Sequence, residues 1–204
     1  MGLIRAVNED AYLHIKKGKI TVQTINSGKT LLGQYIVQDT FHNFEGNYII
    51  PHNIGQLNRN LYLKICRDGI NTNINLLTAD VEPIDTKKID AHLHNKAVIN
   101  TVELRKVAGE LTKIDSKITM IPYEKGCKII YHDGYCENNL TLARLIEGDE
   151  VPIKIDLHKI RRILNNLPHE KTIPIKYSLD TPVKIMLMET PKRNLSVYLV
   201  QEIE

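Results

Sequence analysis

The sequence contains no tryptophan and only two phenylalanines, so a packed core must rest mainly on isoleucine, leucine and valine. β-Branched side chains favour strands. The three cysteines, Cys66, Cys127 and Cys136, lack a Cys-x-x-Cys pair, which argues against a disulfide framework or a zinc ribbon and favours a reducing compartment. We expect no membrane span, because no window approaches the roughly 18 apolar residues that a helix needs to cross a bilayer. We also expect no signal peptide, since residues 1–5 begin no sustained apolar run.

The chain also lacks a strong charge of either sign, with a formal net charge of +3 over 204 residues. A moderate net charge does not exclude DNA binding, which depends on how charge is distributed over the surface. The length fits one large domain or two small domains of about 100 residues each.

The first half reads as a series of strands joined by turn residues. Lys17-Gly18 and Asp68-Gly69 are typical of hairpin turns. The predicted strands cover 12–16, 19–25, 31–37, 48–50, 61–67 and 70–77, and the predicted short helices cover 3–8 and 51–60. The pattern then breaks down over 80–95, which includes Pro83, and this predicts a linker that runs over the surface.

The second half repeats this order. Its predicted helices cover 101–114 and 156–167, and Asp156 is the expected N-cap of the second helix. Its predicted strands cover 116–122, 127–132, 139–145, 151–155, 172–179, 183–189 and 195–201. A repeat of about 100 residues predicts a duplicated α+β domain, each copy placing two short helices on one side of a curved antiparallel sheet.

Four segments resemble a known family. Residues 177–185 (YSLDTPVKI) and 197–204 (VYLVQEIE) resemble the C-terminus of DNA sliding clamps of the proliferating-cell nuclear antigen (PCNA) family. Residues 22–32 (VQTINSGKTLL) resemble a strand-turn-strand of the family's first domain, and 79–82 (ADVE) resembles the start of its interdomain connector. The resemblance implies an N-terminal clamp domain (1–79), a connector (80–95) and a C-terminal clamp domain (96–204).

The implied protein is a processivity factor for replication and repair that encircles duplex DNA without reading its sequence. Its expected partners are double-stranded DNA, a clamp loader, and DNA polymerase and other clients that dock through short peptides. We expect it inside the cell, in cytoplasm or nucleus. The first domain is shorter than the family pattern, because only 3–8 precede the first hairpin and only two strands, 61–67 and 70–77, lie between the second predicted helix and the connector. A homotrimeric ring and a monomeric or heteromeric assembly therefore both stay open.

In this family the helices face the DNA, and the solvent-facing sides of the predicted helices are mostly basic. The expected DNA-binding residues are Arg5, Arg59, Arg105, Lys106, Lys113, His158, Arg161 and Arg162. An ordinary solvated helix face carries the same residue types, so the basic face gains weight only from the resemblance.

Two further sites follow from the resemblance. An apolar pocket for client peptides would be formed by Ile25, Leu32, Ile84, Ile89, Val200 and Gln201. An interface between subunits would use edge strands containing Ile70, Asn73, Ile74, Leu76, Asn139, Leu140 and Leu142.

Other readings of the sequence have less support. Gly28-Lys29-Thr30 resembles the end of a phosphate-binding loop, but Gln23 replaces its first glycine and a strand is expected to follow. Asp90, His92 and His94 offer too few ligands for a closed metal site. We therefore expect no cofactor, no metal and no catalytic activity. The alternatives to a clamp are a clamp-like accessory protein, which engages a host clamp or its clients, and a sequence-specific DNA-binding regulator.

Overall fold

The computed structural model describes residues 7, 10–40, 45–50, 61–67, 70–78, 81–113, 115–131, 134–138, 142–166 and 172–201. The strands of the first half are β1 (Ala11–Lys16), β2 (Gly18–Ile25), β3 (Leu31–Thr40), β4 (Gly46–Ile50), β5 (Leu61–Arg67) and β6 (Ile70–Thr78). Those of the second half are β7 (Asn95–Asn100), β8 (Lys117–Tyr123), β9 (Gly126–Tyr131), β10 (Gly134–Asn138), β11 (Ala143–Glu147), β12 (Ile153–Asp156), β13 (Thr172–Tyr177), β14 (Val183–Glu189) and β15 (Arg193–Leu199). The helices are α2 (Thr86–Asp90), α3 (Thr101–Leu111) and α4 (Leu157–Asn165).

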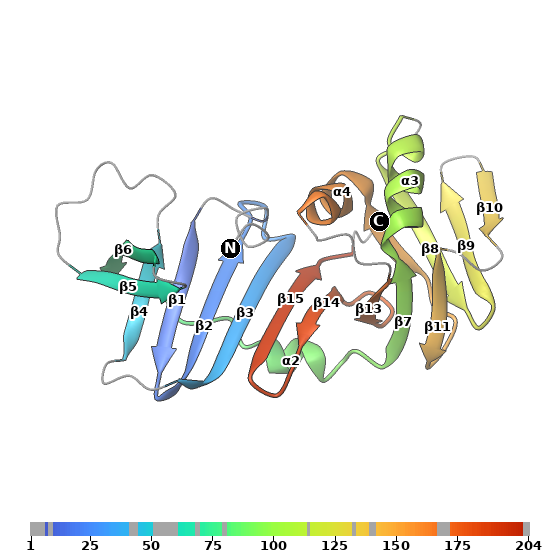
Figure 1. Ribbon diagram of the computed structural model, residues 1–204. Coiled ribbons are helices and arrows are strands. Elements are labelled where there is room, and N and C mark those ends of the chain that lie inside the picture. Colours follow the sequence, from blue (N-terminus) through green and yellow to red (C-terminus); the bar gives the residue numbers. More distant parts are fainter. Residues whose placement is uncertain are drawn as a thin grey trace.

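Most strands belong to one long antiparallel sheet, in the order β11-β7-β13-β14-β15-β3-β2-β1-β4-β6-β5. A second sheet has the order β10-β9-β8-β12. The long sheet joins the two halves of the chain where β15 pairs with β3, from Arg193 opposite Val37 to Leu199 opposite Leu31. Figure 1 shows this curved sheet with α3 and α4 above the strands of the second half. The expected α+β class, with a curved antiparallel sheet and short helices, is confirmed.

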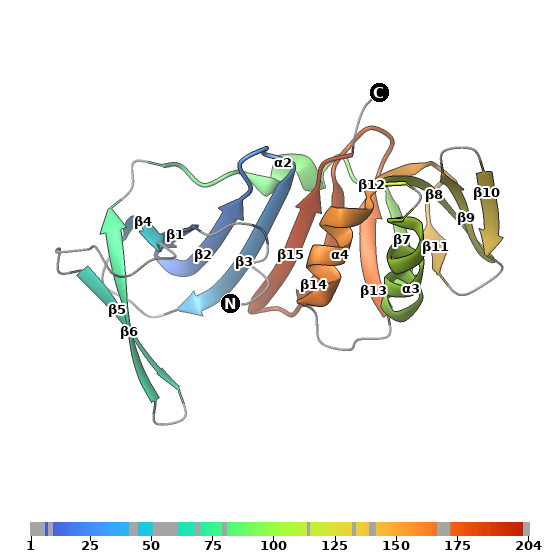
Figure 2. The same ribbon diagram turned by 90° about the horizontal axis from the view of Figure 1, so that it is seen from above.

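The alternation of side chains along β15 places helices on both faces of this sheet. Val197 and Leu199 belong to the main core, which also contains Leu104 of α3 and Ile160 of α4. Tyr198 lies between them in sequence and therefore points to the other face. Its hydroxyl donates a hydrogen bond of 3.1 Å to the Asp90 carboxylate at the end of α2. The connector with α2 thus crosses the face of the sheet opposite to α3 and α4, as Figure 2 shows from above.

The two halves repeat one sheet order. In the first half, β1, β2 and β3 form a meander, and β4 then pairs with the outer side of β1. In the second half, β8, β9 and β10 form a meander, and β12 pairs with the outer side of β8. The orders β3-β2-β1-β4 and β10-β9-β8-β12 are therefore equivalent, and β10 occupies the position that β3 has in the first half.

Several predicted elements are confirmed. The hairpin of β1 and β2 turns at Lys17-Gly18, where Gly18 adopts a left-handed φ of 73° that glycine tolerates without strain. The hairpin of β5 and β6 pairs Arg67 with Ile70, as the Asp68-Gly69 signal predicts. Asp156 caps α4, because its carboxylate accepts a hydrogen bond of 3.0 Å from the backbone N–H of Lys159.

Other elements differ from prediction. The linker expected over 80–95 contains α2, whose first turn is capped by the Asp85 side chain, and its last residue begins β7. The strand expected at 139–145 begins at Ala143, and β10 was not foreseen. Helix α3 ends at Leu111 rather than 114. The helices expected at 3–8 and 51–60 lie outside the described residues, apart from Val7. Within the described parts of the chain, no helix is long and apolar enough to span a membrane.

Candidate functional site

Helix α4 presents a basic face to solvent. Leu157, Ile160, Ile163 and Leu164 are buried along one side of the helix. The remaining side carries His158, Arg161 and Arg162, all exposed. A short amphipathic helix is held in place by the burial of its apolar side, so the opposite side is free for a ligand. These three residues are positioned for contact with a polyanion.

Helix α3 packs beside α4 and contributes less free charge. Arg105 is half-buried, and its guanidinium donates a hydrogen bond of 2.7 Å to the Leu164 carbonyl, which ties α3 to the last turn of α4. Lys106 forms an ion pair of 2.8 Å with Glu103 one turn earlier. Lys113 is exposed in the turn that follows the helix. Arg105 therefore has a positioning role that sequence reasoning missed. Arg5 and Arg59 lie outside the described residues.

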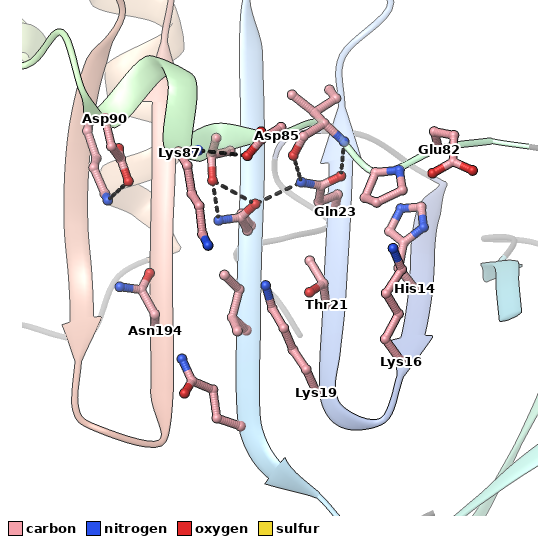
Figure 3. A pocket seen from close by; sticks show the side chains of 17 residues that line it. His14, Lys16, Lys19, Thr21, Gln23, Glu82, Asp85, Lys87, Asp90 and Asn194 are labelled. Carbon is pink, nitrogen blue, oxygen red and sulfur yellow. Dashed lines mark hydrogen bonds and ion pairs between the residues drawn. The ribbon is translucent and has the colours of Figure 1, made fainter. Parts of the chain in front are cut away.

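The side-chain amides of Gln23 and Gln34, called here the carboxamide row, hold the connector by hydrogen bonds against the face of the sheet opposite to α3 and α4. The Gln23 side chain accepts a hydrogen bond of 2.9 Å from the Ile84 backbone N–H and donates one of 2.8 Å to the Ile84 carbonyl. It also donates to the Gln34 side chain at 2.7 Å, and Gln34 in turn donates to the Thr86 hydroxyl at 3.1 Å. Gln23 and Gln34 are directly opposite each other on β2 and β3, so both side chains contact the connector at the same level of the sheet (Figure 3).

A partly buried ion pair holds the end of α2. The Lys184 ammonium lies 2.8 Å from the Asp90 carboxylate and 5.4 Å from the centre of the Tyr198 ring. Burial alone would lower the pKa of Lys184, but the hydrogen bond to Asp90 and the charges of Asp90 and Tyr198 outweigh it and raise that pKa. Burial raises the pKa of Tyr198 as well. The lysine is therefore charged at neutral pH, and the connector is anchored at both of its ends.

Three of the six residues expected in the client pocket line one cavity of about 110 Å³. Ile25 and Leu32 face each other across β2 and β3, and Ile84 covers them from the connector. Tyr12 and Val81 also line this cavity. Both Val81 and Ile84 are 39% exposed, which leaves their side chains accessible to a partner.

The other three expected pocket residues lie elsewhere. Ile89 is half-buried in α2, and Val200 is exposed beyond β15. Gln201 is buried, and its side chain donates hydrogen bonds of 2.9 and 2.7 Å to carbonyls of the 178–181 turn. It also accepts one of 2.8 Å from the Lys154 backbone N–H. Gln201 therefore fastens the tail to the second half of the chain.

The residues expected at an interface between subunits lie in two parts of the chain. Ile70, Asn73, Ile74 and Leu76 belong to β6, which pairs with β5 from Ile70 to Leu76, whereas its pairing with β4 covers only Leu77 and Thr78. Leu142 is fully buried in the main core, so its side chain cannot face a partner. Asn139 and Leu140 lie outside the described residues. β10 ends the second sheet and has a described partner, β9, on one side only.

Solved structures share this arrangement over the whole chain. A chain in the structure described as the C-terminal region of FEN-1 bound to A. fulgidus PCNA superposes with a TM-score of 0.67, covering 100% of this chain and 93% of that one. The chain has a PCNA-like fold. The sequence identity is 13%, so the likeness shows the fold alone. No protein-family model matches the chain, and no curated protein sequence matches it.

The remaining two sequence motifs, Gly28-Lys29-Thr30 and Asp90-x-His92-x-His94, form no phosphate-binding or metal-binding site in the described residues. Gly28-Lys29-Thr30 forms part of the turn between β2 and β3, and a strand follows it where a phosphate-binding loop requires a helix. The Asp90 carboxylate is bound to Lys184 and Tyr198. Among the described residues, no three His, Cys, Asp or Glu side chains are grouped as a metal site.

Proposed function

We propose that the protein is a DNA sliding clamp, a non-catalytic processivity factor that encircles duplex DNA and tethers replication and repair proteins. The observation that carries the proposal is the PCNA-like fold over the whole chain, with an exposed basic face on α4. Lysine and arginine side chains attract phosphates without reading bases, which suits a protein that must move along DNA. Two clamp-like halves, 1–79 and 96–204, would be joined by the connector at 80–95.

The repeated sheet order supports a head-to-tail contact between subunits. Within one chain, β3 receives β15 along its outer edge. β10 is the equivalent of β3 in the second half, and its outer edge has no partner among the described residues. Such an edge is a template for a strand of another chain. The contact would be heterologous, so a ring forms when the rotation between neighbouring subunits closes.

Client proteins would dock at the cavity beneath the connector. Ile25, Leu32, Ile84 and Val81 offer apolar contacts, and main-chain hydrogen bonds of an extended peptide would add affinity. The FEN-1 region named in the PCNA structure is a protein segment of this general kind.

Retention on circular DNA tests the clamp directly. Arg161→Glu with Arg162→Glu reverses charge on the DNA-facing side of α4 and should release the protein from nicked circular plasmid. Lys87→Glu with Lys88→Glu makes the same change in charge on α2, on the opposite face, and should leave retention unchanged. With Arg161→Gln and Arg162→Gln, the slope of log affinity against log salt should fall by about 2, at roughly 0.9 per lost phosphate contact. If the Arg161/Arg162 and Lys87/Lys88 charge-reversal variants were retained equally, the exposed side of α4 would be excluded as the DNA-binding surface.

A clamp-like accessory protein is the second candidate, and one observation favours it. The meander β13-β14-β15 of the second half has only the pair β5-β6 as its counterpart among the described residues of the first half. A missing third strand would leave β10 to be completed by a different protein. Light scattering separates the candidates: three copies of the 23.3 kDa chain give about 70 kDa, whereas an accessory protein stays near one copy. A sequence-specific regulator predicts instead tight binding to one short linear duplex.

A further inference from the structure

A second groove, larger than the apolar cavity, lies on the other side of the connector. Its volume is about 610 Å³, and it is walled on one side by connector residues 82–87. The connector covers the Gln23–Gln34 row of the sheet and so divides the two depressions. The apolar cavity lies over the Ile25–Leu32 row. The groove lies over the next rows in the opposite direction, and Figure 3 shows the side chains that line it.

The floor of the groove is a line of side chains that crosses four strands. His14, Thr21, Ile36 and Asn194 are successive cross-strand neighbours on β1, β2, β3 and β15. Thr21 is 8% exposed and lines the groove, and its hydroxyl is not a buried unsatisfied group, since Tyr177 Oη is the one such side-chain atom in the described part of the chain. The Thr21 hydroxyl is therefore open to the groove and can hydrogen-bond to a molecule that enters it.

The rims of the groove carry unpaired positive charge. Lys16 and Lys19 face each other directly across β1 and β2, an arrangement of like charges that destabilises a strand pair. Lys87 lies on the connector side (Figure 3). No described carboxylate lies within 4.0 Å of these three ammonium groups.

One of the three acids that line the groove is paired with a cation. The Asp85 carboxylate accepts a hydrogen bond from the Lys87 backbone N–H at 3.2 Å, which caps α2 and leaves the negative charge of Asp85 in place. Asp90 is paired with Lys184, so that lysine does not add to the free charge. Glu82 is the third acid, on the connector at the β1 side of the groove (Figure 3), so the four lysines of the lining exceed its three acids by one positive charge. An anion that bound along the rims would relieve the repulsion between Lys16 and Lys19.

We propose that this groove binds an extended acidic peptide segment of a partner protein. Four strands at a spacing of about 4.8 Å span roughly 14 Å, which an extended peptide covers in about four or five residues. The Thr21 hydroxyl and the Asn194 side chain on the floor can bond to peptide groups, and the three lysines select carboxylates. The lining contains no phenylalanine, tyrosine or tryptophan on which nucleotide bases would stack, so single-stranded nucleic acid is a poorer fit. The proposal holds whether or not the chain forms a ring on DNA.

Fluorescence anisotropy of the full chain provides the test. The probes are a fluorescein-labelled Gly-Asp-Glu-Asp-Glu-Asp peptide, its amide twin Gly-Asn-Gln-Asn-Gln-Asn, and a hexanucleotide of thymidine. The acidic peptide should bind at least tenfold more tightly than its twin, with an affinity that falls as salt rises from 50 to 200 mM. The amide twin controls for length and backbone, because the two peptides differ only in charge.

Three variants locate the site. Lys16→Glu with Lys19→Glu should weaken binding of the acidic peptide at least tenfold. Lys106→Glu with Lys113→Glu makes the same change in charge on the helix side of the sheet and should change binding less than twofold. Thr21→Val should weaken binding a few-fold with an unchanged salt dependence, because it removes a hydrogen bond and no charge.

Several results would overturn the proposal. Equal binding of the two peptides, or equal effects of the two charge reversals, would show that no acidic-peptide site exists here. Tighter binding of the thymidine probe, lost with Lys16→Glu and Lys19→Glu, would make the groove a nucleic-acid site instead. Hydrogen exchange of the unliganded variants controls for folding, and protection of Ile36 and Asn194 by the acidic peptide in the parent protein tests the location without any substitution.

Discussion

Replacing Gln23 with alanine should release the connector from the sheet. The substitution removes the two hydrogen bonds to the Ile84 backbone and the one to Gln34. A typical hydrogen bond contributes about 1 kcal/mol net, so three of them amount to about 3 kcal/mol. Water can enter the space that the side chain leaves, because the connector lies at the surface. The loss should therefore appear as local opening of 81–86 and only weakly as global unfolding.

Hydrogen exchange measured by mass spectrometry or NMR reports this opening. A loss of about 3 kcal/mol corresponds to roughly a hundredfold faster exchange, at 1.4 kcal/mol per factor of ten, and the Ile84 amide is the direct reporter. Gln38→Ala is the matched control, because Gln38 points to the same face from β3, is exposed, and forms no side-chain hydrogen bond to the described residues of the connector. Exchange over 81–86 at the parent rate in Gln23→Ala would refute the idea that the carboxamide row holds the connector.

Three further predictions concern the second half of the chain. Burial raises the pKa of Cys127 to about 12 and the pKa of Tyr177 above its usual range, so both groups lose their protons at lower pH in the unfolded chain than in the folded one. Stability against denaturant should therefore fall as pH rises above about 9, and it should fall less steeply in Cys127→Ala. Asp156→Ala should lower the free energy of unfolding by about 1 kcal/mol in urea titrations, whereas Asp156→Asn should retain the cap and most of the stability. Gly148→Ala should cost about 2 kcal/mol or more, since Gly148 has a φ of 96° and a Cβ would collide with Asn95; an unchanged melting temperature would contradict this.

Local signals in the sequence were sufficient for much of the fold. The apolar spacing of α4 and its Asp156 cap define that helix from neighbouring residues alone, as Lys17-Gly18 does for the first hairpin. The sequence did not predict β7, because NKAVIN has an asparagine at each end. The buried side chains of this strand are Asn95, Ala97 and Ile99, and the first of these is polar. Its stability comes from pairing with β11 and β13, which lie far along the chain.

The candidate sites show the same division between local and distant information. The exposed side of α4 follows from helical periodicity, so the exposure of His158, Arg161 and Arg162 could be predicted. The polar contacts were not, because Gln23 finds its partner at Ile84 and Lys184 finds Asp90 only after the sheet has assembled. The alternation of apolar and polar residues along the strand predicts that Gln23 faces solvent, whereas Gln23 is buried under the connector.

The pairing of β15 with β3 has a consequence for how the chain is made. β3 emerges from the ribosome early, but the strand that satisfies its outer backbone groups is among the last to be synthesised. Until then the nascent protein exposes an open strand edge, the feature that most readily recruits neighbouring chains into aggregates. Translation stalled before residue 193 should therefore yield a species that depends on chaperones. Once the finished chain is released, β15 can pair with β3 and cover the open edge.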